Sequence, residues 1–170
     1  MINYDGQSVG LVSEVPPQAR GWRNDKNIWK WCRQNSLISE ADHAAWLNRI
    51  SSDPTIKMFG IALINELFIG VCGLTSIDNI NQKAEFSLYI APEKQRLGYG
   101  KSALYTLLRH GFEDLNLNCI WGECFDGNPA IDMFKELGMT VEGTLRQRYF
   151  REGHFIDTHI VSILRGDFVK

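Results

Sequence analysis

The stretch "QRLGYGKSA" (residues 95–103) separates two runs of different periodicity. Before it, "AEFSLYI" (84–90) alternates apolar and polar residues, which is typical of a strand with one buried face. After it, Leu104, Leu107 and Leu108 recur at the spacing of one helical face. The stretch is therefore the turn from a strand into a helix. Its glycines favour a site for phosphate, because glycine lets a backbone approach an anion closely and a helix N-terminus attracts negative charge.

Two common phosphate-binding motifs fit this turn poorly. A P-loop, G-x-x-x-x-G-K-[ST], matches "GKS" (100–102), but its first glycine would fall on Gln95. The dinucleotide fingerprint G-x-G-x-x-[GA] matches "GYGKSA" (98–103). In that fold the first glycine directly follows the first strand, whereas "APEKQRL" (91–97) intervenes here. The P-loop interpretation fails, and a dinucleotide-binding oxidoreductase stays as a minor alternative.

The composition predicts one soluble, cytoplasmic domain over residues 1–170. A chain of 170 residues with 44% hydrophobic residues can bury one core and is too short for two ordinary domains. Its net charge of -2 argues against a nucleic-acid-binding protein, and no apolar run reaches the roughly 18 residues that would span a bilayer. The cysteines lack metal-ligand spacing, so we expect no metal site. We expect a monomer or a homodimer without nucleic-acid or membrane partners.

The hydrophobic pattern predicts an α/β (α+β) domain with a mixed, mostly antiparallel sheet of about seven strands and about four flanking helices. The predicted strands cover 9–15, 56–64, 67–77, 83–90, 119–125, 140–150 and 154–164. The predicted helices cover 22–34, 39–50, 102–115 and 129–137. Two details are specific: Ser39 is placed as an N-cap, and Asn65 and Glu66 as the turn of a hairpin.

Gln95, Gly98 and Gly100 fill a third phosphate-binding pattern, Q/R-x-x-G-x-G/A, between a strand and an amphipathic helix. With this motif the sequence resembles the GNAT superfamily of acetyl-CoA-dependent N-acetyltransferases over nearly the whole chain. The resemblance implies that the turn holds the pyrophosphate of coenzyme A and that the preceding strand holds the pantetheine. A plain helix-start turn is the alternative. The cofactor-binding residues implied are Leu88, Tyr89, Ile90, Gln95, Arg96, Leu97, Gly98, Tyr99, Gly100, Lys101, Ser102, Asn128 and Phe134.

The same resemblance points to the catalytic groups. An alkylamine, with a pKa of about 10, must lose a proton before it attacks a thioester, and Glu85 is the candidate base, directly or through a water. The alternatives are a solvated glutamate at a strand edge or a carboxylate that only binds a cationic substrate. Relatives carry a tyrosine where this chain has Phe134, which cannot donate a proton. Either water supplies the proton or another residue does; Tyr149 is the candidate acid, and His154 and Tyr89 are other possible donors.

Two further roles rest on the resemblance and keep an alternative. Asn128 would contact the pantetheine, or it would cap the helix that begins at Pro129. The N-terminal helices form the substrate wall in relatives, and there Arg23 could pair with a substrate phosphate. The alternative is that this wall consists of core aromatic residues and an ordinary surface arginine. The substrate-binding residues expected are Trp22, Arg23, Asn24 and His43.

The resemblance implies an N-acetyltransferase that acts by direct attack of a primary amine within a ternary complex. Segments such as "WRND" (22–25) and "SEADH" (39–43) are similar to the branch that holds ribosomal-protein N-terminal, polyamine and nucleotide-aminosugar acetyltransferases. We expect a nucleotide-linked aminosugar as the acceptor, with a protein N-terminus or a polyamine as alternatives. From another class, a non-catalytic acyl-CoA-binding module stays open, because Phe134 replaces the usual acid.

Overall fold

The structure, a computed structural model, describes residues 1–4, 6–63 and 67–169. Its strands are β1 (Gly10–Val12), β2 (Lys57–Ala62), β3 (Phe68–Asp78), β4 (Lys83–Ile90), β5 (Cys119–Phe125), β6 (Thr140–Arg151) and β7 (His154–Leu164). Its helices are α1 (Ala19–Asn24), α2 (Lys26–Trp29), α3 (Glu40–Ser52), α4 (Tyr99–Glu113) and α5 (Ala130–Glu136), with short 3-10 helices η1 (Pro92–Lys94) and η2 (Arg165–Asp167). The predicted turn at Asn65 and Glu66 lies outside the described residues.

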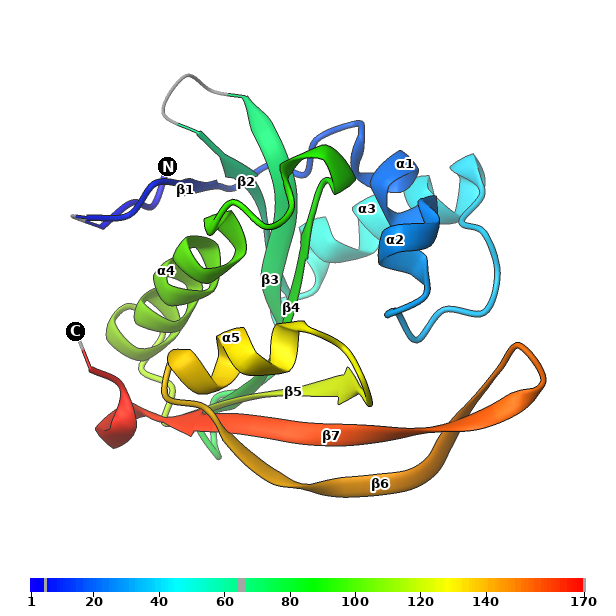
Figure 1. The fold of residues 1–170 in the computed structure, drawn as a ribbon. Coiled ribbons are helices and arrows are strands. Elements are labelled where there is room, and N and C mark those ends of the chain that lie inside the picture. The colour runs from blue at the N-terminus through cyan, green and yellow to red at the C-terminus, as the bar shows by residue number, and fades with distance from the viewer. Residues whose placement is uncertain (5, 64–66, 170) are drawn as a thin grey trace.

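All these strands form one sheet of seven strands, in the order β1-β2-β3-β4-β5-β7-β6. Neighbouring strands are antiparallel except β4 and β5, which are parallel. The β4–β5 pairing runs only from Lys83↔Cys119 to Glu85↔Trp121. Beyond Glu85 the two strands no longer pair, and in Figure 1 β2–β4 stand upright while β5, β7 and β6 lie across below them. The mixed, mostly antiparallel sheet is confirmed, and it opens between β4 and β5.

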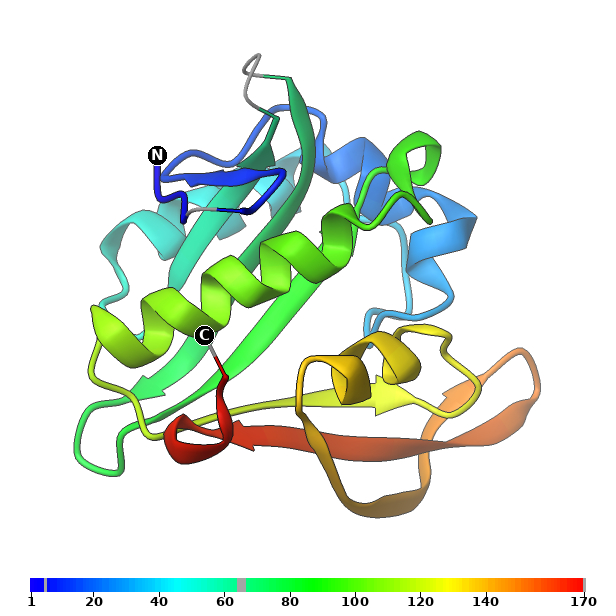
Figure 2. The same cartoon turned by 60° about the vertical axis from the view of Figure 1, so that its left-hand side comes forward.

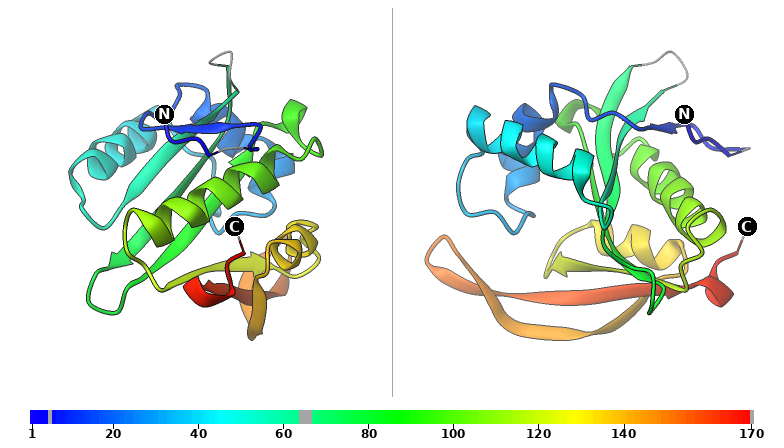
Figure 3. Two further views of the ribbon diagram at one scale, coloured as in Figure 1. Left: turned by 90° about the vertical axis from the view of Figure 1, so that its left-hand side faces the viewer. Right: turned by 180° about the vertical axis from the view of Figure 1, so that it is seen from behind.

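Helices cover both faces of the sheet. Figure 3 shows α1, α2 and α3 on one side of the upright strands and α4 on the other. Figure 2 shows α5 near α4, above the strands of the second half of the sheet. The N-terminal end of α4 meets α5 directly, because a Cβ added at Gly100 would lie 3.5 Å from the sulfur of Met133. The open end of the β4–β5 junction therefore lies between the helix layer of α1 and α2 and the layer of α4 and α5.

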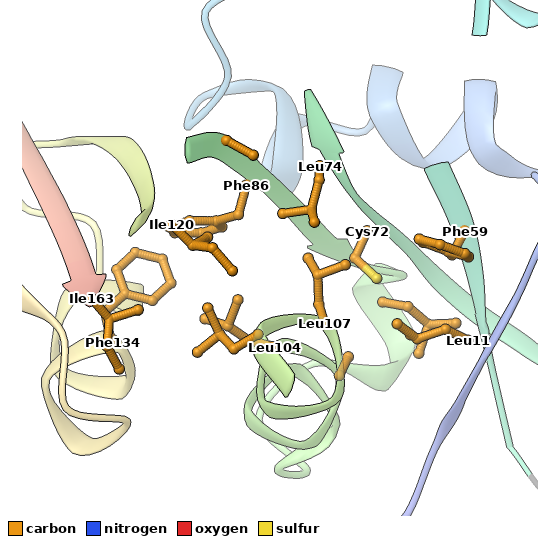
Figure 4. Packing of buried hydrophobic residues seen from close by; sticks show 14 of the residues in the cluster. Leu11, Phe59, Cys72, Leu74, Phe86, Leu104, Leu107, Ile120, Phe134 and Ile163 are labelled. Atoms are coloured by element: carbon orange, nitrogen blue, oxygen red, sulfur yellow. The ribbon is translucent and has the colours of Figure 1, made fainter. Parts of the chain in front are cut away.

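The core lies between α4 and the sheet. Leu104, Leu107 and Leu108 of α4 are completely buried. Figure 4 shows Leu104 and Leu107 on the side of Leu74 and Ile120 of the sheet. Full burial of each leucine stabilises the fold by about 1.5–3 kcal/mol relative to an exposed side chain. The helix predicted from this repeat is confirmed and begins at Tyr99, next to the glycine turn.

The prediction of one continuous helix over 22–34 is wrong. The structure divides this segment into α1 and α2 at Asp25, whose backbone is extended with φ -68° and ψ 135°. The side chain of Asp25 accepts a hydrogen bond from the backbone N–H of Asn27, 2.8 Å away, and so caps α2. A short acidic side chain competes for backbone donors in this way, which a hydrophobic repeat does not reveal. The described residues therefore contain one more α-helix than the approximate count expected.

The N-cap predicted for α3 is confirmed. The hydroxyl of Ser39 accepts a hydrogen bond from the backbone N–H of Asp42 at 3.1 Å, and the Asp42 carboxylate accepts one from the backbone N–H of Ser39 at 3.3 Å. This reciprocal capping box satisfies two backbone donors at the start of the helix. In the described part of the chain, no helix is long and apolar enough to cross a membrane.

Candidate active site

The turn between β4 and α4 has the geometry of an anion-binding turn. Gly98 precedes the helix with φ +82°, a left-handed conformation that glycine adopts without strain. No side chain caps the first turn of α4, and that turn carries no acidic residue. A Cβ added at Gly98 would meet no atom within 4 Å. The backbone N–H groups at this helix end are therefore open to an anionic group such as the pyrophosphate of coenzyme A, and the helix dipole favours it.

Three polar side chains of this turn bind three different parts of the protein. The Gln95 amide donates a hydrogen bond to the carbonyl of Ile90 at 3.0 Å, which ties the turn to the end of β4. Lys101 forms a salt bridge of 2.7 Å with Glu136 of α5, and both side chains are largely exposed. Ser102 is buried, and its hydroxyl accepts a hydrogen bond from the backbone N–H of Ser8 at 3.0 Å. Ser102 thus holds the N-terminal segment in place, while Lys101 stays within reach of solvent.

The remaining predicted residues of the turn lie on its surface or against the core. Arg96 and Leu97 are exposed, and Arg96 has φ +61°. Tyr99 is half-buried and packs against the core. These positions leave the backbone as the part of the turn best placed to bind an anion.

One edge of β4 is open along the predicted pantetheine segment. Leu88, Tyr89 and Ile90 pair with β3 through Cys72, Val71 and Gly70. On the other side, no strand among the described residues pairs with β4 beyond Glu85. Backbone N–H and C=O groups that point away from β3 can therefore bind an extended amide chain as an added strand would.

Tyr89 lies beside an arginine of the N-terminal helices. The guanidinium of Arg23 is 5.5 Å from the centre of the Tyr89 ring, a cation–π distance. Burial raises the pKa of the Tyr89 phenol, and the nearby positive charge of Arg23 offsets this only in part. The phenol is therefore protonated at neutral pH and does not act as a base.

Two buried carboxylates lie where β4 and β5 begin to diverge. Glu85 of β4 is 8% exposed, and the side chain of Glu123 of β5 is 5% exposed. Glu123 accepts hydrogen bonds from the hydroxyls of Thr158 at 2.6 Å and Tyr149 at 3.2 Å. Glu123 was not predicted as a site residue. The one available signal was a carboxylate inside the short apolar strand "CIWGECF" (119–125), since a charged side chain in a buried strand needs partners.

A single guanidinium joins the two carboxylates. Arg33, in the connection between α2 and α3, places Nη2 2.6 Å from Oε1 of Glu85 and Nη1 3.7 Å from Oε2 of Glu123. Partial burial lowers the pKa of Arg33, but Glu85, Tyr149 and Glu123 together raise it further, so the net shift is upward. Arg33 is therefore a permanent cation, and it gives both buried carboxylates a positively charged partner.

More arginines surround this pair. Arg148 of β6 lies 3.7 Å from Glu123, and Arg151 is buried with its guanidinium 5.3 Å from the Trp29 ring and 5.8 Å from the Phe125 ring. Arg151 also donates a hydrogen bond to the carbonyl of Cys32. These contacts hold the tip of the β6–β7 hairpin against the end of α2, which brings residues far apart in sequence to the open end of the sheet.

The predicted substrate wall is brought together only in part. Arg23 lies at the site, where its Nη1 also contacts the Cys32 sulfur at 2.9 Å. Asn24 uses both ends of its amide on the backbone of Ile38, at 3.0 and 2.8 Å, and so holds the loop before α3. His43 stacks on Trp46 within α3, and burial lowers its pKa. Trp22 is half-buried.

Asn128 and Phe134 have structural partners. The side-chain oxygen of Asn128 accepts a hydrogen bond from the backbone N–H of Ala130 at 3.0 Å, which is the capping role left open as an alternative. Phe134 is buried and packs edge-to-face on Phe86, with ring centres 5.2 Å apart. Tyr149, by contrast, stacks on Phe125 at 5.2 Å with its hydroxyl toward Glu123. Tyr149 therefore places a hydroxyl next to the buried Glu123 carboxylate.

Known proteins are similar to this chain in sequence and in fold. The model of the acetyltransferase (GNAT) domain family matches residues 12–140. The spermidine N(1)-acetyltransferase of Vibrio cholerae is 27% identical over 148 residues, 86% of each chain. An uncharacterised N-acetyltransferase of Bacillus licheniformis is 30% identical over 135 residues, which make up 77% of this chain and 75% of the relative.

The fold likeness extends over nearly the whole chain. The crystal structure of the spermidine N-acetyltransferase from Vibrio cholerae in complex with CoA and spermine has a TM-score of 0.89 to this structure at 24% identity, covering 96% of this chain and 99% of that one. The matched family segment, 12–140, contains the open β4 edge, the glycine turn and both buried carboxylates. The chain therefore belongs to the GNAT acetyltransferase family, and it is an acetyl-CoA-dependent N-acetyltransferase.

Proposed function

We propose that the protein transfers the acetyl group of acetyl-CoA to the primary amine of a nucleotide-linked aminosugar, by direct attack within a ternary complex. The arginines near the two buried carboxylates carry this proposal: Arg33 contacts Glu85 and Glu123, and Arg148 contacts Glu123. Guanidinium groups bind phosphate oxygens strongly, so such a site favours an acceptor with phosphate groups over a polycation. The contact network that includes Glu85 and Glu123 contains Arg23, Arg33, Arg148 and Arg151.

The chain's own groups would bind the coenzyme along two backbone segments. The N–H groups at the start of α4, next to Gly98, would hold the pyrophosphate, and the open edge of β4 at Leu88–Ile90 would hold the pantetheine amides. When bound, acetyl-CoA supplies an acetyl thioester whose carbonyl carbon accepts the amine. A backbone N–H at the β4 edge would stabilise the negative charge that develops on the carbonyl oxygen.

Glu85 would remove the proton from the acceptor amine. The residue lies at the last β4–β5 pair, directly before the open edge, so its carboxylate borders the space where amine and thioester meet. Arg33 occupies Oε1 of Glu85, and no hydrogen-bond donor among the described residues contacts Oε2. One carboxylate oxygen therefore stays available to an ammonium group or to a water that carries its proton.

Tyr149 is the proposed donor for the leaving thiolate. Its hydroxyl lies inside the site, 3.2 Å from Glu123, and its ring is held by Phe125. The hydroxyl of Tyr149 would donate the proton that a tyrosine at the position of Phe134 donates in relatives.

Direct transfer agrees with the state of the nearest cysteine. Cys32 contacts Arg23 at the site, but burial raises the pKa of its thiol, and the charges of Arg23, Arg151 and Arg33 oppose this shift only partly. A thiol is a weak nucleophile compared with its thiolate, so a covalent acetyl-enzyme on Cys32 is disfavoured.

A polyamine is the second candidate acceptor, because relatives of this chain are spermidine acetyltransferases by name. A polyamine needs free carboxylates for its several ammonium groups. Here Arg33 and Arg148 already contact Glu123, and Arg33 contacts Glu85. These contacts favour the aminosugar over the polyamine.

Release of free thiol from acetyl-CoA tests the proposal. Purified protein is offered nucleotide-linked aminosugars, spermidine and short peptides with varied N-termini, and the product is identified by mass. We expect turnover on a nucleotide-linked aminosugar with a kcat/KM at least about tenfold above that for spermidine. Preference for spermidine or a peptide would refute the acceptor assignment. Tight acetyl-CoA binding without turnover on any amine would favour the non-catalytic coenzyme-binding module.

A further inference from the structure

Arg33 occupies a site that two buried carboxylates would otherwise offer to a cation. Its guanidinium spans the opening between β4 and β5, with one nitrogen 2.6 Å from Glu85 and another 3.7 Å from Glu123. We propose that Arg33 determines the class of acceptor: it fills the position of a second ammonium group and thereby excludes di- and polyamines. This inference rests on the proposed acetyl transfer, and it adds the residue that selects the substrate.

The oxygens of the two carboxylates are used unequally. Each oxygen of Glu123 has partners: Thr158 and Arg148 at Oε1, Tyr149 and Arg33 at Oε2. Glu85 has Arg33 on Oε1 and, within the described residues, no donor on Oε2. An acceptor with one amine can therefore use Oε2 of Glu85 while Arg33 stays in place. A second ammonium group would find Glu123 fully occupied and would meet the positive charge of Arg33.

Removal of Arg33 would take away the one positive charge that Glu85 and Glu123 share and would make the site less positive. Side chains of Glu85 and Glu123 are 10% and 5% exposed, so two negative charges with little access to water would remain close to the open edge. Such a pair favours binding of a cation that can reach both. The site would then bind cationic acceptors better and anionic acceptors less well than before.

Arg33 can be replaced without damage to the core. It lies in the connection between α2 and α3, and its side chain is 50% exposed. Its described polar contacts are the two carboxylates. A side chain that is half exposed can also pair with an anionic oxygen of the acceptor. The same side chain would therefore attract a phosphate-bearing acceptor and repel a polyamine.

Calorimetric titration of spermidine into the protein without acetyl-CoA tests the inference directly. We expect Arg33→Gln to bind spermidine on the order of tenfold more tightly than the wild type, since it removes one opposing charge beside two buried carboxylates. Arg33→Lys keeps the charge and should bind spermidine as weakly as the wild type. The matched control is Arg109→Gln, because Arg109 lies on α4 and pairs with Glu113 at 3.0 Å. This control should leave spermidine binding unchanged.

A double variant keeps the test decisive if Arg33→Gln is unstable. Arg33→Gln with Glu123→Gln removes one positive and one negative charge, so the balance of the site is restored. The gain in spermidine binding should then disappear, while a gain that persists would contradict a two-carboxylate cation site. Equal spermidine affinity of a folded Arg33→Gln variant and the wild type would also overturn the inference.

Turnover separates this inference from the proposed function. The ratio of kcat/KM for spermidine to that for the aminosugar acceptor should rise in Arg33→Gln and not in Arg33→Lys. If no amine is acetylated by the wild type but spermidine binds to Arg33→Gln, the cation site stands and the proposed function fails. If the wild type acetylates an aminosugar but Arg33→Gln gains no spermidine binding, the function stands and the role of Arg33 fails.

Discussion

Replacing Glu85 with glutamine removes the proposed base and keeps its shape. The glutamine oxygen can still accept the hydrogen bond that Arg33 now donates at 2.6 Å, and Arg33 keeps Glu123 as a second partner at 3.7 Å. Because Arg33 is half exposed, solvent screens the lost charge, and we expect a loss of only about 1 kcal/mol in the free energy of unfolding. Circular dichroism and a denaturant titration check that the variant is folded.

The catalytic effect should be far larger than the effect on stability. An alkylamine with a pKa of about 10 is roughly 1% neutral at pH 8, and without a base only this fraction can attack. We therefore expect kcat/KM to fall on the order of 10²-fold at pH 8, with coenzyme affinity unchanged. The deficit should shrink about tenfold for each pH unit up to the pKa of the amine, because solution then removes the proton.

Steady-state kinetics over a range of pH distinguish this role from a simple anchor. If Glu85 only binds the ammonium group, Glu85→Gln should raise KM and leave kcat unchanged. Glu152→Gln at the hairpin turn serves as the control, since Glu152 is exposed. A Glu85→Gln enzyme with the kcat/KM and pH profile of the wild type would refute the reasoning.

Three further substitutions test the coenzyme turn, the proton donor and the core. Gly98→Val forces a branched side chain into φ +82°, and a cost of about 1–2 kcal/mol should weaken coenzyme A binding on the order of tenfold by calorimetry. Unchanged affinity would contradict the assignment of this turn. Tyr149→Phe keeps the stacking on Phe125 but removes the hydroxyl 3.2 Å from Glu123, so kcat should fall about 10–100-fold with KM unchanged; a wild-type kcat would exclude Tyr149 as the acid. Leu107→Ala empties a fully buried position and should lower the free energy of unfolding by about 2–5 kcal/mol in a denaturant titration, whereas a loss below about 1 kcal/mol would argue against the packing of α4.

The parts of the fold that could be predicted are those with a local cause. The strand over 83–90 and the helix from Tyr99 follow from alternating and helical repeats, and the glycine turn between them follows from Gly98. The capping box at Ser39 is likewise contained in four consecutive residues. Where a side chain overrides the repeat, prediction failed: Asp25 caps α2 and divides a segment that reads as one helix.

Site residues close to the glycine motif in sequence could likewise be predicted, whereas those whose partners lie far away in sequence could not. Glu85 could be proposed because it precedes the glycine turn on the same strand. Glu123 could not, because its partners Thr158, Tyr149 and Arg33 come from β7, β6 and the connection after α2. The amide of Asn24 forms hydrogen bonds with the backbone of Ile38, a contact that no spacing in the sequence indicates.

Local sequence was thus sufficient for the strands, for the helix from Tyr99 and for the glycine turn before it, since glycine conformation and hydrophobic repeats act over a few residues. Which charged side chains meet near the open end of the sheet depends on the tertiary fold. Glu85 and Glu123 lie 38 positions apart in the chain, and they share Arg33 only because β4 and β5 are parallel neighbours that diverge after Glu85. Pairing between distant strands and the burial that follows from it decide which charges meet, and no single segment of the chain contains that information.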